Sequence, residues 1–250
     1  MSATFHDHFS KAAQGYAQAR PTYPEALFRH AAEAAPAREA AWDCATGNGQ
    51  AALGLARHFA RVEATDASAQ QIEHAIAAPN VHYSVQPAET TTFASASFDA
   101  VCVAQALHWF DIERFYAEVR RVLRPGGIVL VVAYGWQNVT PEFDREMKRL
   151  VIDPVRPLWP EQNALILNQY RDVPFPFERV PFPALAIEVR WSLAQMMDYL
   201  GTWTATRRML EKDPEFLVRS RDTLAHAWGA EAERLVTMPL TVHCGRHGGR

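Results

Sequence analysis

Hydrophobic residues in the first half of the chain form two patterns that alternate. Short runs rich in β-branched residues are typical of buried strands, and between them apolar residues recur at helical spacing. The predicted strands cover residues 39–44, 61–66, 81–85, 98–106 and 128–135. The predicted helices cover residues 25–35, 50–60, 69–77 and 112–123. This alternation predicts an α/β fold with a doubly wound, mostly parallel sheet and right-handed crossovers.

The second half begins with a change in composition after Trp136, where prolines and aromatic residues become dense. A long connection of this kind between sheet elements is usually a functional insertion, so residues 137–183 are expected to form a lid with a helix over 141–152. Residues 184–191 alternate like a strand. Pro239 interrupts the last apolar run, which is therefore expected to be an edge strand or to contain a bulge.

The remaining C-terminal stretches, 192–212 and 214–228, have the composition and spacing of helices. A length of 250 residues suits one large domain. We therefore expect one domain with four parts, namely a helical N-terminal cap, a core, the lid, and C-terminal strands and helices that complete the sheet, over residues 1–36, 37–135, 137–183 and 184–250.

Composition and charge narrow the class of protein. The formal net charge is −3, which gives no electrostatic reason to expect a nucleic-acid partner. The three cysteines have no metal-binding spacing, and the pair His6 and His8 has no clustered ligands, so neither a disulfide framework nor a metal site is expected. Without a signal-like or membrane-spanning run, we expect a cytoplasmic protein, either a monomer or a homodimer.

The segment from Ala41 to Ala56 predicts a strand, a glycine turn and a helix, which is the geometry that cradles a nucleotide-like cofactor. Gly47, Gly49 and Ala52 fit the dinucleotide pattern G-x-G-x-x-[G/A]. Starting from Asp43, the same residues fit Asp-x-Gly-x-Gly-x-Gly, with Ala45 in place of the first glycine. The first pattern indicates hydride transfer, and the second indicates methyl transfer.

Two aspartates bear on this choice. Asp66 follows Gly47 by 19 positions, where an acidic residue binds ribose hydroxyls in either kind of site. Asp43 discriminates, because its carboxylate would repel a dinucleotide diphosphate and attract the ammonium and sulfonium groups of S-adenosylmethionine. Asp43 could also merely order its own turn.

Four segments, considered together, resemble the successive motifs of the class I S-adenosylmethionine-dependent methyltransferases. They read WDCATGNG from residue 42, EATDAS from 63, VQPAETTTFASASFDAVCVAQALHWF from 85 and VRRVLRPGGIVLV from 119. Within that family they look most like the type 11 domain and its small-molecule branch of trans-aconitate-methyltransferase-like enzymes. The resemblance implies a seven-stranded Rossmann-like sheet whose last strand is antiparallel, with the cofactor across the carboxyl ends of the first four strands.

The resemblance also implies a set of cofactor-binding residues. These are Asp43, Ala45, Gly47 and Gly49 for the methionine side, Asp66 for the ribose with Ala67 beside the adenine, Ala88 and Glu89 at the adenine edge, Ala104 and Gln105 after the fourth strand, and Arg20 and Tyr16 folded over the cofactor. The sequence departs from the family at two positions. Ala45 adds a methyl group where a glycine is usual, and it is expected to forbid a strongly glycine-like φ. Pro87 stands where many relatives have an aspartate for the adenine amino group.

Methyl transfer to a small organic acceptor, through a carboxylate, hydroxyl or amine, is the expected reaction, and S-adenosylhomocysteine is the expected product. His108 is the candidate general base, although it could instead position the substrate. Trp109, Tyr134 and Trp203 are candidates for the substrate pocket, or for ordinary core packing. Family members that methylate nucleic-acid amines typically carry an Asn/Asp-Pro-Pro-Tyr/Phe run after the fourth strand, and this chain has Ala-Gln-Ala-Leu there. A silent S-adenosylmethionine-binding protein and an NAD-dependent oxidoreductase remain alternatives.

Overall fold

A computed structural model describes residues 21–248. Those residues form two compact units. The sheet unit comprises residues 22–135, 164–186 and 239–248, and the helical unit comprises 136–163 and 187–238. The predicted lid segment is thus divided between the two units, and the lid function itself remains a proposal. Within residues 21–248, no helix has the length and apolar character needed to cross a membrane.

The sheet runs in the order β3-β2-β1-β4-β5-β8-β6. Its strands are β1 (Ala40–Cys44), β2 (Arg61–Asp66), β3 (Val81–Val85), β4 (Phe98–Ala104), β5 (Leu123–Tyr134), β6 (Glu178–Arg179) and β8 (Arg234–Arg246). The first five are parallel, whereas β8 is antiparallel to both β5 and β6. The α/β class, the mostly parallel sheet and the antiparallel last strand are therefore confirmed, and β7 (Ala186–Trp191) joins as an eighth strand beside β8.

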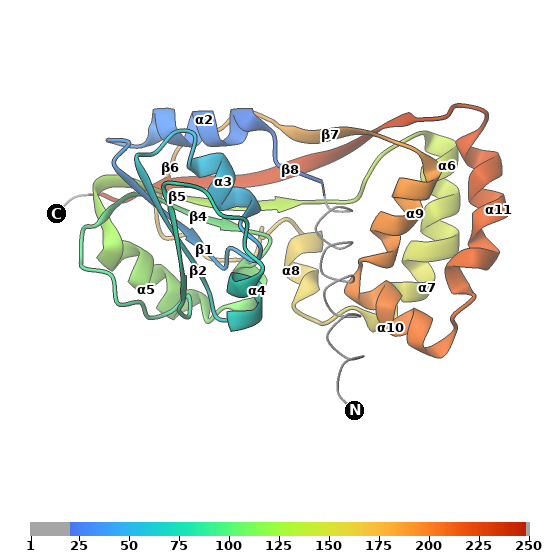
Figure 1. Cartoon of the computed structure of the whole chain (residues 1–250), viewed down its shortest axis with the longest axis horizontal. Helices are drawn as coiled ribbons and strands as arrows, with labels where there is room; N and C mark the ends of the chain where they lie inside the picture. The colour runs from blue at the N-terminus through green and yellow to red at the C-terminus, as the bar shows by residue number, and fades with distance from the viewer. Residues whose placement is uncertain (1–20, 249–250) are drawn as a thin grey trace. The chain divides into compact units, whose positions relative to one another are not determined.

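Helices of the sheet unit cover both faces of the sheet (Figure 1). They are α2 (Glu25–Ala34), α3 (Gln50–Leu55), α4 (Ala69–Glu73), the short turn η1 (Leu107–Trp109), α5 (Ile112–Val122) and α8 (Asn163–Leu167). One core packs α2 and α3 against Ala41, Val62 and Ile128, while the other packs α5 against Trp42 and Val129. Because neighbouring residues of a strand face opposite ways, strands buried on both faces must be almost continuously apolar, which explains why the sequence reveals them.

The helical unit contains α6 (Pro141–Met147), η2 (Lys148–Ile152), α7 (Asp153–Val155), η3 (Arg156–Leu158), α9 (Leu193–Gly201), α10 (Thr204–Lys212) and α11 (Phe216–Trp228). Helices α6 and α11 lie side by side (Figure 1), with the rings of Phe143 and Trp228 5.1 Å apart. The single helix predicted over 192–212 is wrong. It is two helices, because the chain turns at Thr202 and Trp203, where the Thr202 hydroxyl donates to the Tyr199 carbonyl.

Two further expectations are corrected. Helices α3 and α4 end several residues earlier than predicted, at Leu55 and Glu73, because the chain tightens into three-residue turns there. The strand containing Pro239 is not an edge strand, since β8 lies between β5 and β6 in the strand order, with residues 240–246 paired to β5 and the last two of them also paired to β6. Pro239 directly precedes Leu240, the first residue of β8 that pairs with β5. Its lack of an N–H group therefore removes no hydrogen bond of that pairing.

Asp99 fixes the amino ends of the central strands. It is fully buried at the start of β4, and one carboxylate oxygen accepts from the backbone N–H groups of Glu39 and Ala40, at 2.9 and 3.0 Å. The other oxygen accepts from Arg124 at 2.7 Å. A single side chain therefore links the beginnings of β1, β4 and β5.

Replacing Asp99 with alanine leaves two backbone donors and a guanidinium without their partner. We expect Asp99→Ala to lower the free energy of unfolding by about 3 kcal/mol, measured by urea denaturation. Arg124→Gln should cost clearly less, because the arginine side chain is about one-third exposed. Equal losses for the two variants would contradict the assigned role of the backbone contacts.

Candidate functional site

The predicted cofactor residues gather where the parallel strands β1, β2 and β4 end. Cys44, the last residue of β1, is paired with Thr65 on one side and with Val103 on the other. The strand order reverses between β1 and β4, because the chain runs outward to β3 before it returns to β4. Open α/β sheets bind ligands at such a switch point, outside the carboxyl ends of the strands.

The residues directly after β1 and β4 both have left-handed backbone conformations. Ala45 has φ of +54° and Gln105 has φ of +55°. Ala45 thus has a positive φ, but one in the left-handed region, which is open to alanine at a cost of about 1 kcal/mol. Two such costs on adjacent strands are the kind of backbone strain that concentrates at binding sites.

The two glycines of the turn have different roles: Gly49 cannot carry a side chain because Tyr83 lies against it, whereas the space beside Gly47 is open. A methyl group on Gly49, where φ is +93°, would overlap the hydroxyl group of Tyr83 from β3. A methyl group on Gly47, where φ is +56°, would meet no described atom closer than Gln71 Oε1 at 4.0 Å. The backbone at Gly47 is therefore open to close approach by a ligand.

Asp66 connects the end of β2 to this turn. Its Oδ2 accepts from the Gly47 N–H at 3.0 Å, and its Oδ1 accepts from the Ser68 N–H at 2.8 Å. Each carboxylate oxygen can accept a second hydrogen bond, so these contacts leave room for ribose hydroxyls. Ala67, between them in sequence, is exposed.

Asp43 is a buried carboxylate with an unused oxygen. The residue is only 1% exposed. Its Oδ2 accepts from the Thr46 hydroxyl at 2.5 Å, whereas Oδ1 has no hydrogen-bond partner among the described residues. Burial raises the pKa of Asp43 to about 7, with a smaller contribution from the Asp66 charge, and the Thr46 hydroxyl and the nearby Ala52 N–H oppose this shift. A cationic ligand at Oδ1 would restore the charge that burial disfavours.

Gln105 offers a second unused acceptor at the same edge. Its Nε2 donates to the Tyr134 carbonyl at 3.4 Å, and its Oε1 is buried without a partner among the described residues. Ala104, which precedes it at the end of β4, is half-buried. Two orphaned acceptor oxygens fit a ligand that carries an ammonium group, as S-adenosylmethionine does, and they do not fit a diphosphate.

Of the two residues predicted to contact the edge of the adenine ring, Ala88 and Glu89, one is buried and the other already accepts a hydrogen bond. Ala88 is buried, and Glu89 Oε1 accepts from the Asp111 N–H at 3.0 Å, one residue before α5 begins. Asp111 itself caps α5 through a 3.2 Å hydrogen bond from the Arg114 N–H. Glu89 therefore holds the start of a helix with one oxygen and has the other left for a ligand.

His108 lies in η1, directly after β4. It is 5% exposed, and its Nδ1 is 3.2 Å from the hydroxyl oxygen of Tyr170. Burial lowers the pKa of His108 to about 4, so the ring is neutral near pH 7. A base with so low a pKa is weak at neutral pH, which disfavours the general-base alternative.

The three predicted pocket aromatics do not belong to one unit. Trp109 is 56% exposed, and its ring centroid is 4.6 Å from that of His108. Tyr134 ends β5 and is buried, with its ring 6.2 Å from that of Tyr23. Trp203 is in the helical unit, where its ring contacts those of Trp136 and Trp159. Tyr16 and Arg20 lie outside the described residues.

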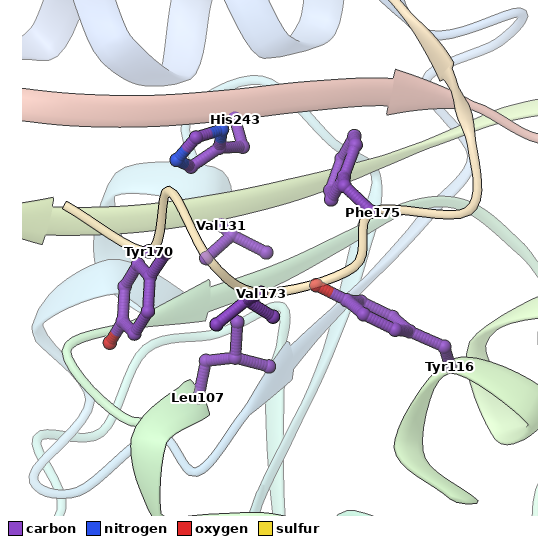
Figure 2. Close-up of a pocket in the computed structure, with 7 residues that line it drawn as sticks. All are labelled: Leu107, Tyr116, Val131, Tyr170, Val173, Phe175 and His243. Atoms are coloured by element: carbon purple, nitrogen blue, oxygen red, sulfur yellow. The ribbon is translucent and has the colours of Figure 1, made fainter. Parts of the chain in front are cut away.

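A shallow apolar hollow lies next to this region within the sheet unit. Figure 2 shows its lining, which is Leu107, Tyr116, Val131, Tyr170, Val173, Phe175 and His243. The structure thus adds residues that the sequence did not single out. Thr46 and Tyr83 support the glycine turn, and Tyr170 contacts His108 across 62 residues of sequence, a separation that hides it from any local pattern. Among the described residues, no cluster of His, Cys, Asp or Glu could hold a metal.

Comparison with known proteins identifies the family. Residues 42–131 match the family model described as a methyltransferase domain. A solved structure from Anaeromyxobacter dehalogenans, provisionally named a type II methyltransferase, is 43% identical, covers 92% of this chain and 99% of its own, and has a TM-score of 0.87. The chain belongs to the class I S-adenosylmethionine-dependent methyltransferases.

A more distant relative and a structural neighbour are also similar to this chain. A Dictyostelium discoideum protein, also provisionally named a methyltransferase, is 29% identical over 232 residues, which is 90% of this methyltransferase and 87% of the relative. A structure from Bacillus halodurans is 18% identical, covers 90% of this chain and 99% of its own, and has a TM-score of 0.51. At that identity the second likeness supports the fold alone.

The two glycines of the turn can be separated by experiment. Gly49→Ala should lower the free energy of unfolding by about 2 kcal/mol, because the added methyl group overlaps Tyr83, and Tyr83→Phe in the same chain should recover part of the loss. The matched variant Gly47→Ala should cost about 1 kcal/mol, from its positive φ alone. If Gly47→Ala proves the more destabilising in urea denaturation, the distinction is wrong.

Asp43 should also make stability depend on pH. Burial raises its pKa from 3.8 to about 7, so over this range the folded protein retains a proton that the unfolded chain has released. Its contribution to stability is therefore lost as pH rises through this range. Relative to the native protein, Asp43→Asn should gain in melting temperature as pH increases from about 4 to about 7. A constant difference between the two proteins would show that the Asp43 pKa is not raised.

Proposed function

We propose that this methyltransferase transfers the methyl group of S-adenosylmethionine to a small organic acceptor, which offers a carboxylate, hydroxyl or amine as nucleophile. The observation that carries the cofactor assignment is the unpaired Oδ1 of the buried Asp43. A positively charged ligand is the natural partner for a carboxylate that the fold leaves half-satisfied at the switch point.

The chain's residues supply binding and alignment. Asp43 and Gln105 provide acceptors for the ammonium group, the open backbone at Gly47 permits close approach, and Asp66 faces the ribose from the end of β2. The bound cofactor would supply an activated methyl group on a sulfonium centre. For an in-line displacement of this kind, the protein mainly has to hold two reactants in line and keep water out.

A small acceptor is favoured over a nucleic acid by two features. The formal net charge of −3 provides no attraction for a phosphate backbone. The segment after β4 is Ala104-Gln105-Ala106-Leu107, which lacks the Asn/Asp-Pro-Pro-Tyr/Phe run expected of enzymes that methylate nucleic-acid amines. The exposed indole of Trp109 beside His108 offers an apolar face to such an acceptor.

Ligand-dependent melting tests the cofactor assignment. S-adenosylhomocysteine should raise the melting temperature of the native protein, and NAD should not. Asp43→Asn should remove the shift with S-adenosylmethionine, since it replaces the buried anion by a neutral amide of the same shape. Asp99→Asn is the matched control at the opposite end of the same strands: it should lower the melting temperature but preserve the ligand-induced shift. A shift with NAD alone would overturn the proposal.

The acceptor is sought by adding labelled S-adenosylmethionine to panels of small carboxylic acids, phenols and amines, with tRNA and duplex DNA as comparison substrates. Transfer to a member of the small-molecule panels supports the proposal. Preferential transfer to nucleic acid contradicts the acceptor class. Cofactor binding without transfer to any substrate favours the alternative of a silent binding protein.

A further inference from the structure

Tyr170 is held beside His108 by a backbone that most residues avoid. It follows Gln169, and the two have φ values of +55° and +63°. The turn is fixed at both ends: the Tyr170 N–H donates to the Leu165 carbonyl at 2.8 Å, and His243 Nε2 is 2.9 Å from the Gln169 carbonyl. Figure 2 shows the Tyr170 hydroxyl directed away from His243. Two consecutive left-handed residues that are not glycine mark a position where the surrounding structure imposes a side-chain direction.

The Tyr170 hydroxyl has one acceptor. The residue is 3% exposed, and His108 Nδ1, at 3.2 Å, is its hydrogen-bond partner among the described residues. Burial raises the pKa of Tyr170 above its usual value, so the phenol keeps its proton at neutral pH. If Nδ1 carried the proton of the neutral ring, it would donate to the phenol oxygen, and the buried phenol O–H would be left without an acceptor among the described residues. The hydroxyl therefore donates and Nδ1 accepts.

The protonation of the other ring nitrogen, His108 Nε2, follows from this contact. A neutral imidazole carries one proton, so an Nδ1 that accepts from Tyr170 places the proton on Nε2. His108 Nε2 forms no hydrogen bond with the described residues, and the exposed Trp109 ring adjoins the imidazole. His108 consequently presents a single N–H donor beside an apolar surface.

We propose that Tyr170 is a positioning residue that fixes His108 as the Nε2–H tautomer, so that His108 donates a hydrogen bond to an oxygen of the methyl acceptor instead of removing its proton. The role toward the acceptor rests on the proposed function, whereas the tautomer does not. An N–H donor cannot take up a proton at the same nitrogen, so the acceptor's nucleophile must already be unprotonated when it binds. A carboxylate or an unprotonated amine meets this requirement, whereas a neutral hydroxyl does not, because its proton would have no base to receive it.

Tautomers can be observed directly by ¹⁵N nuclear magnetic resonance of the imidazole rings in the full-length protein, with His108 assigned by comparison with His108→Gln. At about pH 7 the native protein should show His108 protonated at Nε2 and unprotonated at Nδ1. In Tyr170→Phe, the same ring should populate both tautomers. A native spectrum with the proton on Nδ1 would overturn the proposal, whether or not methyl transfer is ever detected.

Tyr116→Phe is the matched control. Tyr116 is buried and lines the same hollow, but its hydroxyl has no hydrogen-bond partner among the described residues. Removing that hydroxyl should leave the His108 tautomer unchanged. If both variants shift the tautomer equally, the effect is one of packing and Tyr170 has no specific role.

Kinetics with an identified acceptor provides a second readout. Tyr170→Phe should lower kcat/KM several-fold without introducing a new ionisation near neutral pH in the kcat profile, and Tyr116→Phe should leave kcat/KM unchanged. A native kcat profile that requires a deprotonated group with the pKa of His108 would restore the general-base role and refute the donor role.

Discussion

The site depends on a carboxylate that the fold buries and satisfies only by half. Asp43 lies between two neighbouring strands at the switch point, and Thr46 engages one of its oxygens and leaves the other without a partner among the described residues. An unpaired buried acceptor costs free energy in the absence of a ligand. The site should therefore prefer a cationic ligand to a diphosphate, because a cation pairs with the free Asp43 oxygen and a diphosphate would be repelled by it.

The surrounding residues are arranged around this constraint. Asp66 fixes the glycine turn through the Gly47 N–H, and Tyr83 blocks any side chain at Gly49, so the turn is held from two neighbouring strands. Ala45 and Gln105 accept left-handed conformations directly after β1 and β4. The amino ends of the same strands carry the fully satisfied Asp99. The central strands thus carry a hydrogen-bonded carboxylate, Asp99, at their amino ends, and the unpaired acceptors of Asp43 and Gln105 at their carboxyl ends.

The sequence was sufficient for the parts of the fold that depend on periodicity. The strands around Trp42 and Val101 are nearly continuous apolar runs because both faces are covered, and α5 begins at Ile112 as predicted, capped by Asp111. Helix ends were less predictable, since α3 and α4 stop where three-residue turns form, and the residues that follow them directly, Ala56 and His74, are not helix breakers. The division between α9 and α10 lies at Trp203, whose backbone is extended, and apolar spacing does not register such a local change.

In the candidate site, too, some residues could be predicted from the sequence and others could not. Asp43, Asp66 and the glycines follow a local motif, so the sequence could bring them together. The contact between Tyr170 and His108 spans 62 residues, and the positive φ of Ala45 opposes the usual preference of alanine; both arise from tertiary packing and are invisible in a motif. The three aromatic residues predicted for the acceptor pocket belong to different units, so local patterns carry the least information about the acceptor.

Proton release on cofactor binding tests the central claim most directly. Since burial raises the pKa of Asp43 to about 7, most molecules carry a proton on it at about pH 6, and a bound cation should expel it. Calorimetric titration with S-adenosylmethionine in buffers of different ionisation enthalpy should therefore show release of close to one proton at about pH 6 and almost none above about pH 8. Binding with the same proton balance at both pH values would contradict the account.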